Sequence, residues 1–268
     1  MFLKPYKLRQ FLGNETERAP DHVGRIWRDG HDERNRIVAV IPVNCLGMPG
    51  PIDELCDVAK SFGLMVIEDA AAALGSFYRD KHCGTFGLAG AISFNYNKIV
   101  TTQGGGAILT DDDWFAARAY QLSTTARVPH AWLVEHDDIG WNYRMGSINA
   151  ALGLAQLERF DEIIQKKRVL AERYREALRD IRGVRFLDPK CDVYSVPNNW
   201  LNSIVVDPPL RDEIFKALHA EGILARALPT PLHTLPMYRD HPKYYSGMAE
   251  SKALFETVVC LPSGPELV

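Results

Sequence analysis

Two residues of this 268-residue chain have the types and spacing that carbonyl chemistry uses, Asp69 and Lys98. Asp69 ends the apolar run LMVIED (64–69), and Lys98 follows the short run AISFN (91–95). Ligands of parallel α/β sheets bind at the carboxyl ends of the strands, so we expect both side chains at one edge of a sheet. A solvated charge is the commoner fate of a lysine, and a helix cap or surface charge is the commoner fate of such an aspartate.

The pair matches what pyridoxal 5′-phosphate requires. A lysine amine forms a Schiff base with the coenzyme aldehyde, and a carboxylate keeps the pyridine nitrogen protonated so that the ring accepts electrons. Either residue alone is a weak signal. The two together, each at the end of a strand-like run, favour this coenzyme.

The elements that must position this pair are typical of a βαβ unit. Residues 36–43 are strand-like, and residues 51–63 have a helical pattern with Pro51 at its start and Gly63 at its end. The apolar residues of LMVIED predict a strand covered on both faces, as in a parallel sheet. Upstream, residues 26–35 carry an Asp-Gly turn signal and predict an exposed hairpin or loop.

The rest of the chain continues an α/β pattern. We predict a strand at 105–110, a helix at 111–123, and a helical pattern over 147–183 that begins with Ser147 as its N-cap and breaks near Asp161. Beyond it, strand-like runs at 184–187, 200–207 and 223–228, a helix at 211–222 and a proline-rich tail predict a small α+β domain. The expected division is a large domain over 1–160 and a small C-terminal domain over 161–268.

The composition narrows the class of protein. The chain is 46% hydrophobic and 24% charged with a formal net charge of -3, which is typical of a soluble globular protein and does not favour nucleic acid as a partner. It contains no signal-peptide pattern and no apolar run long enough for a membrane span, so we expect no membrane partner. Five scattered cysteines predict reduced thiols in the cytoplasm. The histidines form no ligand cluster, and no metal site is expected.

Five motifs, in order along nearly the whole chain, resemble the DegT/StrS family of sugar aminotransferases. They are VIEDAAAALGS (66–76), GTFG (84–87), SFNYNKIVTTQGGGAILT (93–110), GWNYRMGSINAALGLAQLER (140–159) and LPTPLHTLPMY (228–238). The resemblance implies the fold type I of pyridoxal phosphate-dependent transferases. It also implies transfer of an amino group, with glutamate as donor, to a nucleotide-linked 4-keto-6-deoxy sugar in amino-sugar or polysaccharide biosynthesis. The lysine motif is most similar to members that act on UDP sugars.

The resemblance implies a role for each matched residue. Lys98 would be the Schiff-base lysine and the proton-transfer group, Asp69 the partner of the pyridine nitrogen, and Ser93 a ligand of the coenzyme phosphate. Asn142 would reach the phosphate bound to a neighbouring subunit, which implies a homodimer. Without the resemblance, Ser93 is interpreted as a strand-end hydroxyl and Asn142 as a turn residue.

For three further features of the sequence, two interpretations of their role stay open. Arg144 either contacts the substrate or stabilises its own loop. Arg226 either contacts the substrate or forms a surface salt bridge. Gly104–Gly106 either let the backbone approach the coenzyme or form a tight hairpin turn.

Two departures from the family pattern leave the function open. Ala72 stands where the family usually carries Gln, Glu or His. Relatives also carry an upstream segment with a phosphate-binding helix N-terminus and a ring-stacking aromatic, so the resemblance implies a large mixed-sheet domain that lacks its first βα units and exposes apolar sheet surface. The chain is therefore either a sugar-nucleotide transaminase or a truncated, non-catalytic remnant that binds a relative or is inert. A dehydratase of the same family is disfavoured because that branch replaces the lysine with histidine.

Overall fold

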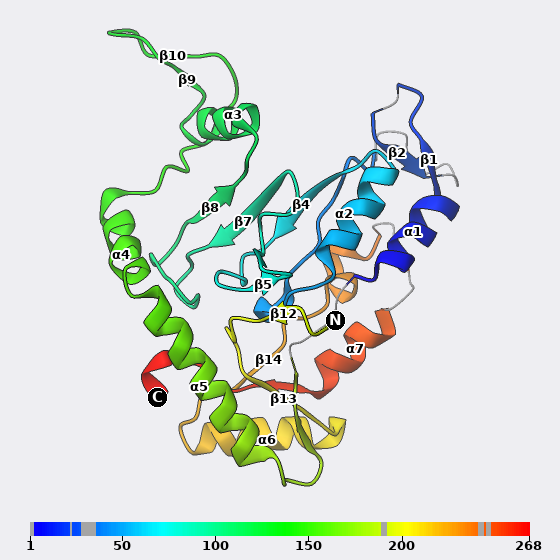
Figure 1. The fold of residues 1–268 in the computed structure, drawn as a ribbon, viewed down its shortest axis with the longest axis vertical. Helices are drawn as coiled ribbons and strands as arrows, with labels where there is room; N and C mark the ends of the chain where they lie inside the picture. Colours follow the sequence, from blue (N-terminus) through cyan, green and yellow to red (C-terminus); the bar gives the residue numbers. More distant parts are fainter. Residues whose placement is uncertain (1–2, 22, 28–35, 189–191, 241–243, 245–247) are drawn as a thin grey trace.

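The computed structural model, which describes residues 3–21, 23–27, 36–188, 192–240, 244 and 248–268, places a four-stranded mixed sheet at the centre of the first half of the chain (Figure 1). Its order is β3-β4-β7-β8, formed by Ala39–Val40, Met65–Asp69, Ala89–Ser93 and Gly106–Leu109. The first three strands are parallel, and β8 is antiparallel to β7. Helix α2 (Ile52–Ser61) connects β3 to β4, which confirms the predicted βαβ unit.

Helix α2 forms where the sequence places its signals. Pro51 lies at the N-cap, acidic side chains occupy the first turn, and Gly63 follows the helix with a φ of 70°. Its buried face packs against β3 and β4, beside helix α1 (Pro5–Asn14), which the sequence analysis does not predict. A hairpin of β1 (Thr16–Arg18) and β2 (Arg25–Trp27) follows α1. The predicted Asp-Gly turn at 29–30 lies outside the described residues.

The two faces of the central sheet differ, which corrects the prediction that residues 64–69 are covered on both faces. Val66 and Glu68 are buried on the face that carries α2. On the other face Met65 remains 48% exposed, as do Ile41 (61%) and Ile108 (56%). A continuous apolar run therefore does not by itself report cover on both sides, because apolar side chains also occupy sheet surface that the described residues leave open.

Glu68 is a fully buried carboxylate next to Asp69 in sequence. Its oxygens accept hydrogen bonds from the backbone N–H groups of Gly84 (2.7 Å), Phe86 (2.6 Å) and Gly87 (3.3 Å). These donors compensate the loss of hydration that a buried carboxylate would otherwise suffer. The GTFG motif is thus tied to β4 by the residue that precedes Asp69.

The middle of the chain forms an arm that projects at one end of the molecule (Figure 1). Helix α3 (Asp113–Ser123) confirms the predicted helix, with Asp112 as its N-cap accepting from Phe115 N. The arm is the antiparallel hairpin of β9 (Arg127–Val128) and β10 (Glu135–His136), within residues 124–144. A smaller sheet, β12-β5-β6, pairs Ser195–Val196 with Phe77–Tyr78 and the latter with Lys81–His82.

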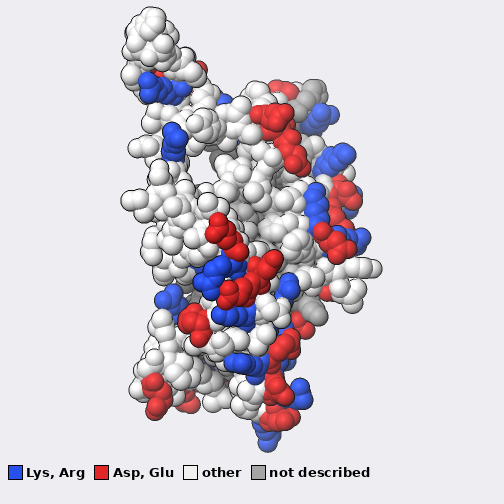
Figure 2. Space-filling view, turned by 60° about the vertical axis from the view of Figure 1, so that its left-hand side comes forward, with Lys and Arg blue, Asp and Glu red and all other residues white. Residues whose placement is uncertain are grey.

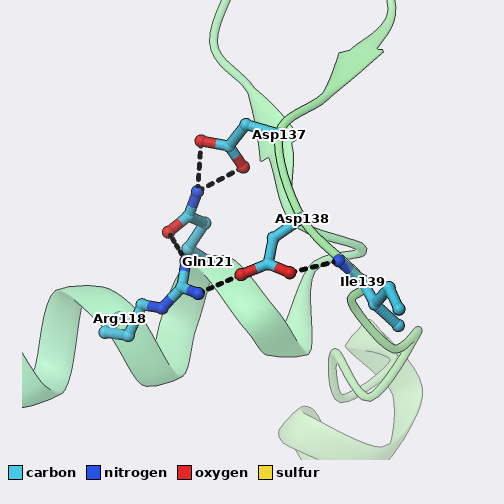
Figure 3. Close-up of polar contacts among 5 residues, drawn as sticks. All are labelled: Arg118, Gln121, Asp137, Asp138 and Ile139. Carbon is cyan, nitrogen blue, oxygen red and sulfur yellow. Dashed lines mark hydrogen bonds and ion pairs between the residues drawn. The ribbon is translucent and has the colours of Figure 1, made fainter.

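The base of the arm is fastened to α3 by a group of polar side chains that we call the bracket: Arg118, Gln121, Asp137 and Asp138 (Figure 3). The Gln121 amide donates to both oxygens of Asp137, at 2.7 and 2.9 Å. Arg118 donates to Gln121 Oε1 (2.8 Å) and pairs with Asp138, which in turn accepts from the Ile139 N–H. Arg118 and Gln121 are partly buried and the two aspartates are exposed, so the bracket ties the arm to α3 without burying it.

The long helical pattern breaks as predicted, into α4 (Ser147–Leu157) and α5 (Phe160–Leu178). Gly146, not Ser147, occupies the N-cap position, and no side chain caps the helix there. The remainder forms the sheet β11-β13-β15-β14, made by Val184–Phe186, Ser203–Val206, Val258–Cys260 and Arg226–Ala227. Helices α6 (Pro208–Ala220) and α7 (Met248–Thr257) pack against it.

Predicted strands at 184–187, 200–207 and 223–228 thus correspond to β11, β13 and β14, whereas α7 and β15 fall in the segment interpreted as a proline-rich tail. The division at residue 160 stays a prediction. Cys45, Cys56, Cys83 and Cys260 are free thiols. Among the described helices, none is long and apolar enough to cross a bilayer.

Candidate active site

Asp69 and Ser93 lie at the carboxyl ends of adjacent parallel strands. Asp69 pairs with Ala91 across β4 and β7, so Ser93 stands two residues further along the same side of the sheet. Asp69 Oδ1 accepts from the Ala71 N–H at 3.1 Å, and Ser93 Oγ accepts from the Asn95 N–H at 3.2 Å. Because Ser93 Oγ accepts in that bond, its own O–H remains to donate to a ligand.

Lys98 lies in a loop, residues 94–105, that is closed at its base by two backbone hydrogen bonds. Phe94 N–H donates to Gly105 O (3.0 Å), and Thr102 N–H donates to Phe94 O (2.9 Å). Gly105 has a φ of 101°, a conformation that glycine adopts without strain. This favours the tight-turn interpretation of Gly104–Gly106.

Helix α4 holds this loop from outside. The Gln156 amide donates to Thr101 O (2.6 Å) and accepts from Thr101 N (3.1 Å), while Asn149 Nδ2 donates to Thr102 O (2.6 Å). A Cβ atom at Gly153 would stand 2.8 Å from the Thr102 methyl group, so glycine is what lets the helix approach this closely. The motif GSINAALGLAQLER therefore positions the lysine loop as well as forming a helix.

The Lys98 side chain is half-buried and rests on an aromatic ring. Its Nζ lies 4.0 Å from the centroid of the Trp200 ring, a cation–π distance. Burial lowers the pKa of the Lys98 amine because water is withdrawn from the ammonium form, and the negative charge of Asp69 opposes part of that change. Lys98 is thus an amine with an increased neutral fraction, within the electrostatic reach of Asp69.

Trp200 and Asn198 are site residues that the sequence analysis does not identify. Both line the cavity around Lys98, together with Ala71, Ala72, Leu74, Ser93, Ile99 and Val100. Asn198 Nδ2 donates to Ala72 O (2.8 Å) and Leu74 O (2.9 Å), which brings residues 198–200 against the end of β4. No local pattern marks them, because their contacts join positions more than a hundred residues apart.

The donor set fits pyridoxal 5′-phosphate in its chemistry. The coenzyme needs a lysine amine and a carboxylate for its ring nitrogen, which Lys98 in the loop after β7 and Asp69 at the end of β4 supply. Ser93, at the end of β7, has a hydroxyl to donate to the phosphate. The cavity that Lys98 lines has a free volume of about 10 Å³, the space of about one water molecule, so it has no room for a ligand of coenzyme size.

Asn142 and Arg144 line a different cavity, of about 810 Å³, beneath the arm. It shares no lining residue with the Lys98 cavity and is bounded by α3 and the arm, including Tyr120, Arg127 and His130. Both Asn142 and Arg144 are exposed. Within one chain, the structure therefore brings together Asp69, Ser93 and Lys98 and holds Asn142 and Arg144 apart from them.

Arg226 is the first residue of β14, pairs with Cys260 across the sheet and is exposed. It lines neither of these two cavities. Ala72 lies at the Lys98 cavity, where its carbonyl accepts from Asn198, so the position is occupied by a backbone contact and a methyl group.

Comparison with known proteins shows the family to which the chain belongs. Residues 33–268 match the model described as the DegT/DnrJ/EryC1/StrS aminotransferase family. The chain is 41% identical over 233 residues to the "Putative pyridoxal phosphate-dependent aminotransferase EpsN" of Bacillus subtilis (strain 168), a match covering 85% of this chain and 59% of EpsN. GDP-perosamine synthase of Escherichia coli O157:H7 is 35% identical over 236 residues, covering 87% and 62%.

A solved structure agrees with the sequence matches. The crystal structure of DesI in the presence of its TDP-sugar product superposes with a TM-score of 0.76 at 31% identity, covering 92% of this chain and 61% of DesI. The expected α/β fold, fold type I of the pyridoxal phosphate-dependent transferases, is confirmed. The chain spans about three fifths of the length of the relatives it matches.

Proposed function

We propose that this chain, which belongs to the DegT/DnrJ/EryC1/StrS aminotransferase family, carries the lysine side of a site that transfers an amino group to a nucleotide-linked keto sugar. The observation that carries this proposal is the half-buried Lys98 amine, whose pKa burial lowers, beside Asp69 at an adjacent strand end. A lysine nucleophile at neutral pH needs such a lowered pKa, and a buried amine obtains it by desolvation.

The residues of the chain have separate tasks in this proposal. Bound pyridoxal phosphate supplies an electron sink that stabilises negative charge on the reacting carbon. Asp69 holds the ring nitrogen in its protonated form, and Ser93 donates its hydroxyl to the phosphate. Lys98 Nζ would bind the coenzyme and, once the substrate amine displaces it, would act as the general acid and base of the 1,3-proton shift.

Relatives guide the choice of substrate. One is named a GDP-perosamine synthase, and DesI was determined with a TDP-sugar product, so the nucleotide differs between relatives while the sugar nucleotide class is shared. We propose a 4-keto-6-deoxy sugar on a nucleotide as acceptor and glutamate as amino donor, in amino-sugar or polysaccharide biosynthesis in the cytoplasm. Arg144 and Arg226 are the proposed contacts for anionic parts of the substrates.

The arm and α4 support a homodimer. Helix α4 has no charged residue. Its Ile148 is 86% exposed, and three further apolar residues of the helix are exposed to a lesser degree, namely Leu152, Leu154 and Leu157. Figure 2 shows few charged side chains on the part of this face that the arm and α4 form, whereas acidic and basic side chains gather lower on the same face. In the proposed dimer Asn142 of one chain binds the coenzyme phosphate of the other.

The test is covalent capture of the coenzyme. Full chain incubated with pyridoxal phosphate and reduced with borohydride should carry one added coenzyme on the peptide that contains Lys98, located by mass spectrometry. Lys98→Ala should lose the absorbance band and the adduct, while Lys60→Ala, which changes an exposed lysine of α2, should keep both. Equal capture by Lys98→Ala would overturn the assignment.

A second candidate is a non-catalytic subunit that binds a longer relative. Ala72 and the exposed apolar face of the central sheet favour it. Capture at Lys98 without release of an amino sugar from a 4-keto sugar nucleotide and glutamate would favour this candidate; turnover at a rate on the order of 1 per second or above would exclude it.

A further inference from the structure

The structure assigns a positioning role to Trp200: its indole face holds the Lys98 amine at the edge of the small cavity that both residues line, ready to meet a carbonyl group. This inference deepens the proposed function and rests on it for the identity of the carbonyl compound. It rests on three hydrogen bonds that fix Trp200 and on the contact that the Trp200 ring makes with the lysine amine.

The backbone of Trp200 is fixed from both sides. Its N–H donates to Asn198 Oδ1 at 2.9 Å, and Asn198 is itself tied to the carbonyls of Ala72 and Leu74. Its carbonyl accepts from Lys167 Nζ at 2.8 Å. Lys167 is buried in α5 and also donates to Ser263 O, so the carbonyl of Trp200 is held by a side chain with little freedom to move.

The indole ring is fixed as well. Trp200 Nε1 donates to Asn97 O at 2.7 Å, which ties the ring to the residue that precedes Lys98. The ring face then lies 4.0 Å from Lys98 Nζ. One side chain therefore contacts the lysine loop twice, through the backbone of Asn97 and through the amine of Lys98.

Lys98 and Trp200 together line the cavity of about 10 Å³, where the amine is partly withdrawn from water. The ammonium form loses water there, and the negative face of the indole replaces part of the lost interaction. Asp69 is the charged group that acts on the amine from the neighbouring strand. The ring and Asp69 both favour the ammonium form, whereas burial favours the neutral form. The position of the amine thus depends on the ring and not only on the space around it.

The test measures the reactivity of Lys98 directly, without turnover. The full chain, freed of carbonyl compounds by dialysis, is labelled with trace acetic anhydride from pH 6 to 11, and acetylation of Lys98 is quantified by mass spectrometry against exposed Lys60. Trp200→Leu keeps the cavity apolar but removes the ring face. In this variant we expect the pH of half-maximal Lys98 acetylation to lie about 0.4 to 1.5 units below that of the native chain. Below this pH, Lys98 of the variant should therefore be labelled about 2- to 30-fold faster.

The conservative variant separates positioning from packing. Trp200→Phe keeps a ring face and should restore a midpoint close to that of the native chain, whereas a purely structural role would shift Phe and Leu alike. Trp114→Leu, at an exposed tryptophan of α3, is the matched control and should change nothing. Trp200→Met provides a second variant without a ring, in case Trp200→Leu does not fold.

Each outcome decides the point. An unchanged midpoint in the ring-free variants, or an equal shift in Trp200→Phe, would overturn the inference, and so would unfolding of both Leu and Met variants, because the ring would then act in folding. Coenzyme capture by Lys98→Ala would instead overturn the proposed function and leave the labelling result standing. The two failures are therefore distinguishable.

Discussion

The Lys98 cavity and the cavity beneath the arm are built in different ways. The Lys98 cavity is lined by three parts of the chain, namely the segment after β4, the lysine loop and residues 198–200, and α4 holds the loop from outside. The cavity that Asn142 and Arg144 line is formed by residues between Tyr120 and Arg144, and both side chains are exposed. The Lys98 cavity thus depends on long-range contacts, whereas the cavity beneath the arm is local and open, as the proposed homodimer requires.

Of the substitutions around Lys98, Asp69→Asn should have the largest effect, which is on the affinity for the coenzyme. It removes the negative charge at the strand end but keeps an oxygen for the Ala71 N–H, so the strand end should survive. A charge-assisted hydrogen bond is worth about 1.5–3 kcal/mol, so the apparent Kd for pyridoxal phosphate should rise about 10- to 150-fold. Absorbance titration measures it; an unchanged Kd would remove Asp69 from the site.

Lys167→Met tests whether water is excluded from the buried lysine that holds the Trp200 carbonyl. Burial lowers the pKa of Lys167 from 10.5 to about 8, so the unfolded chain binds the proton more tightly than the folded chain. The destabilisation of the fold by the buried Lys167 charge is fully present below pH 8 and is lost as the pH rises toward 10.5. The native free energy of unfolding should therefore gain roughly 2 kcal/mol, relative to Lys167→Met, between pH 7.5 and pH 10.

Urea titrations of both proteins at the two pH values give this difference, and other titrating groups cancel because both proteins carry them. Parallel pH dependence in the two proteins would show that Lys167 is hydrated, and the contrast between a closed and an open region would then be weaker than the structure indicates.

A mixing experiment tests whether the open region meets a second chain. Lys98→Ala and Asn142→Ala chains each lack one part of every site in their own homodimers. A mixed dimer contains one site with both residues intact, so random mixing should restore about a quarter of the sites, measured as coenzyme capture at a concentration where only intact sites bind. No recovery on mixing, with dimers present by sedimentation, would place Asn142 outside a shared site.

Changes in the bracket should have the smallest effect. Arg118→Ala removes contacts with Gln121 and Asp138, both at the surface. Exposed ion pairs contribute little, so hydrogen exchange at the Ile139 amide and along the arm should accelerate by at most about fivefold, with no change in the urea midpoint. Arg159→Ala, which breaks another exposed pair with Glu162, should leave arm exchange unaltered.

The sequence predicts those parts of the fold that depend on local signals. The βαβ unit, α3 and the break between α4 and α5 follow from periodicity, proline and glycine positions and capping side chains, all of which lie within the element itself. The predicted strand at 91–95 is displaced by two residues, because β7 is fixed by pairing with β4 and β8 and not by its own residue types.

The candidate site is predictable where one residue type is needed at a strand end and not where distant segments meet. Asp69, Ser93 and Lys98 could be chosen from the sequence together with a family resemblance. Trp200 and Asn198 could not, since their neighbours are separated from them by most of the chain. Helix α7 and β15 escape prediction for a similar reason, since their cover comes from α6 and β13.

The buried carboxylate of Glu68 helps to fix the register of β4, and with it the position of Asp69. Successive strand residues point to opposite faces, so a slip of β4 by one position would move Glu68 to the face that now carries Asp69. Glu68 would then lose its three N–H donors. These three hydrogen bonds therefore favour the register in which Asp69 lies on the same side of the sheet as Ser93.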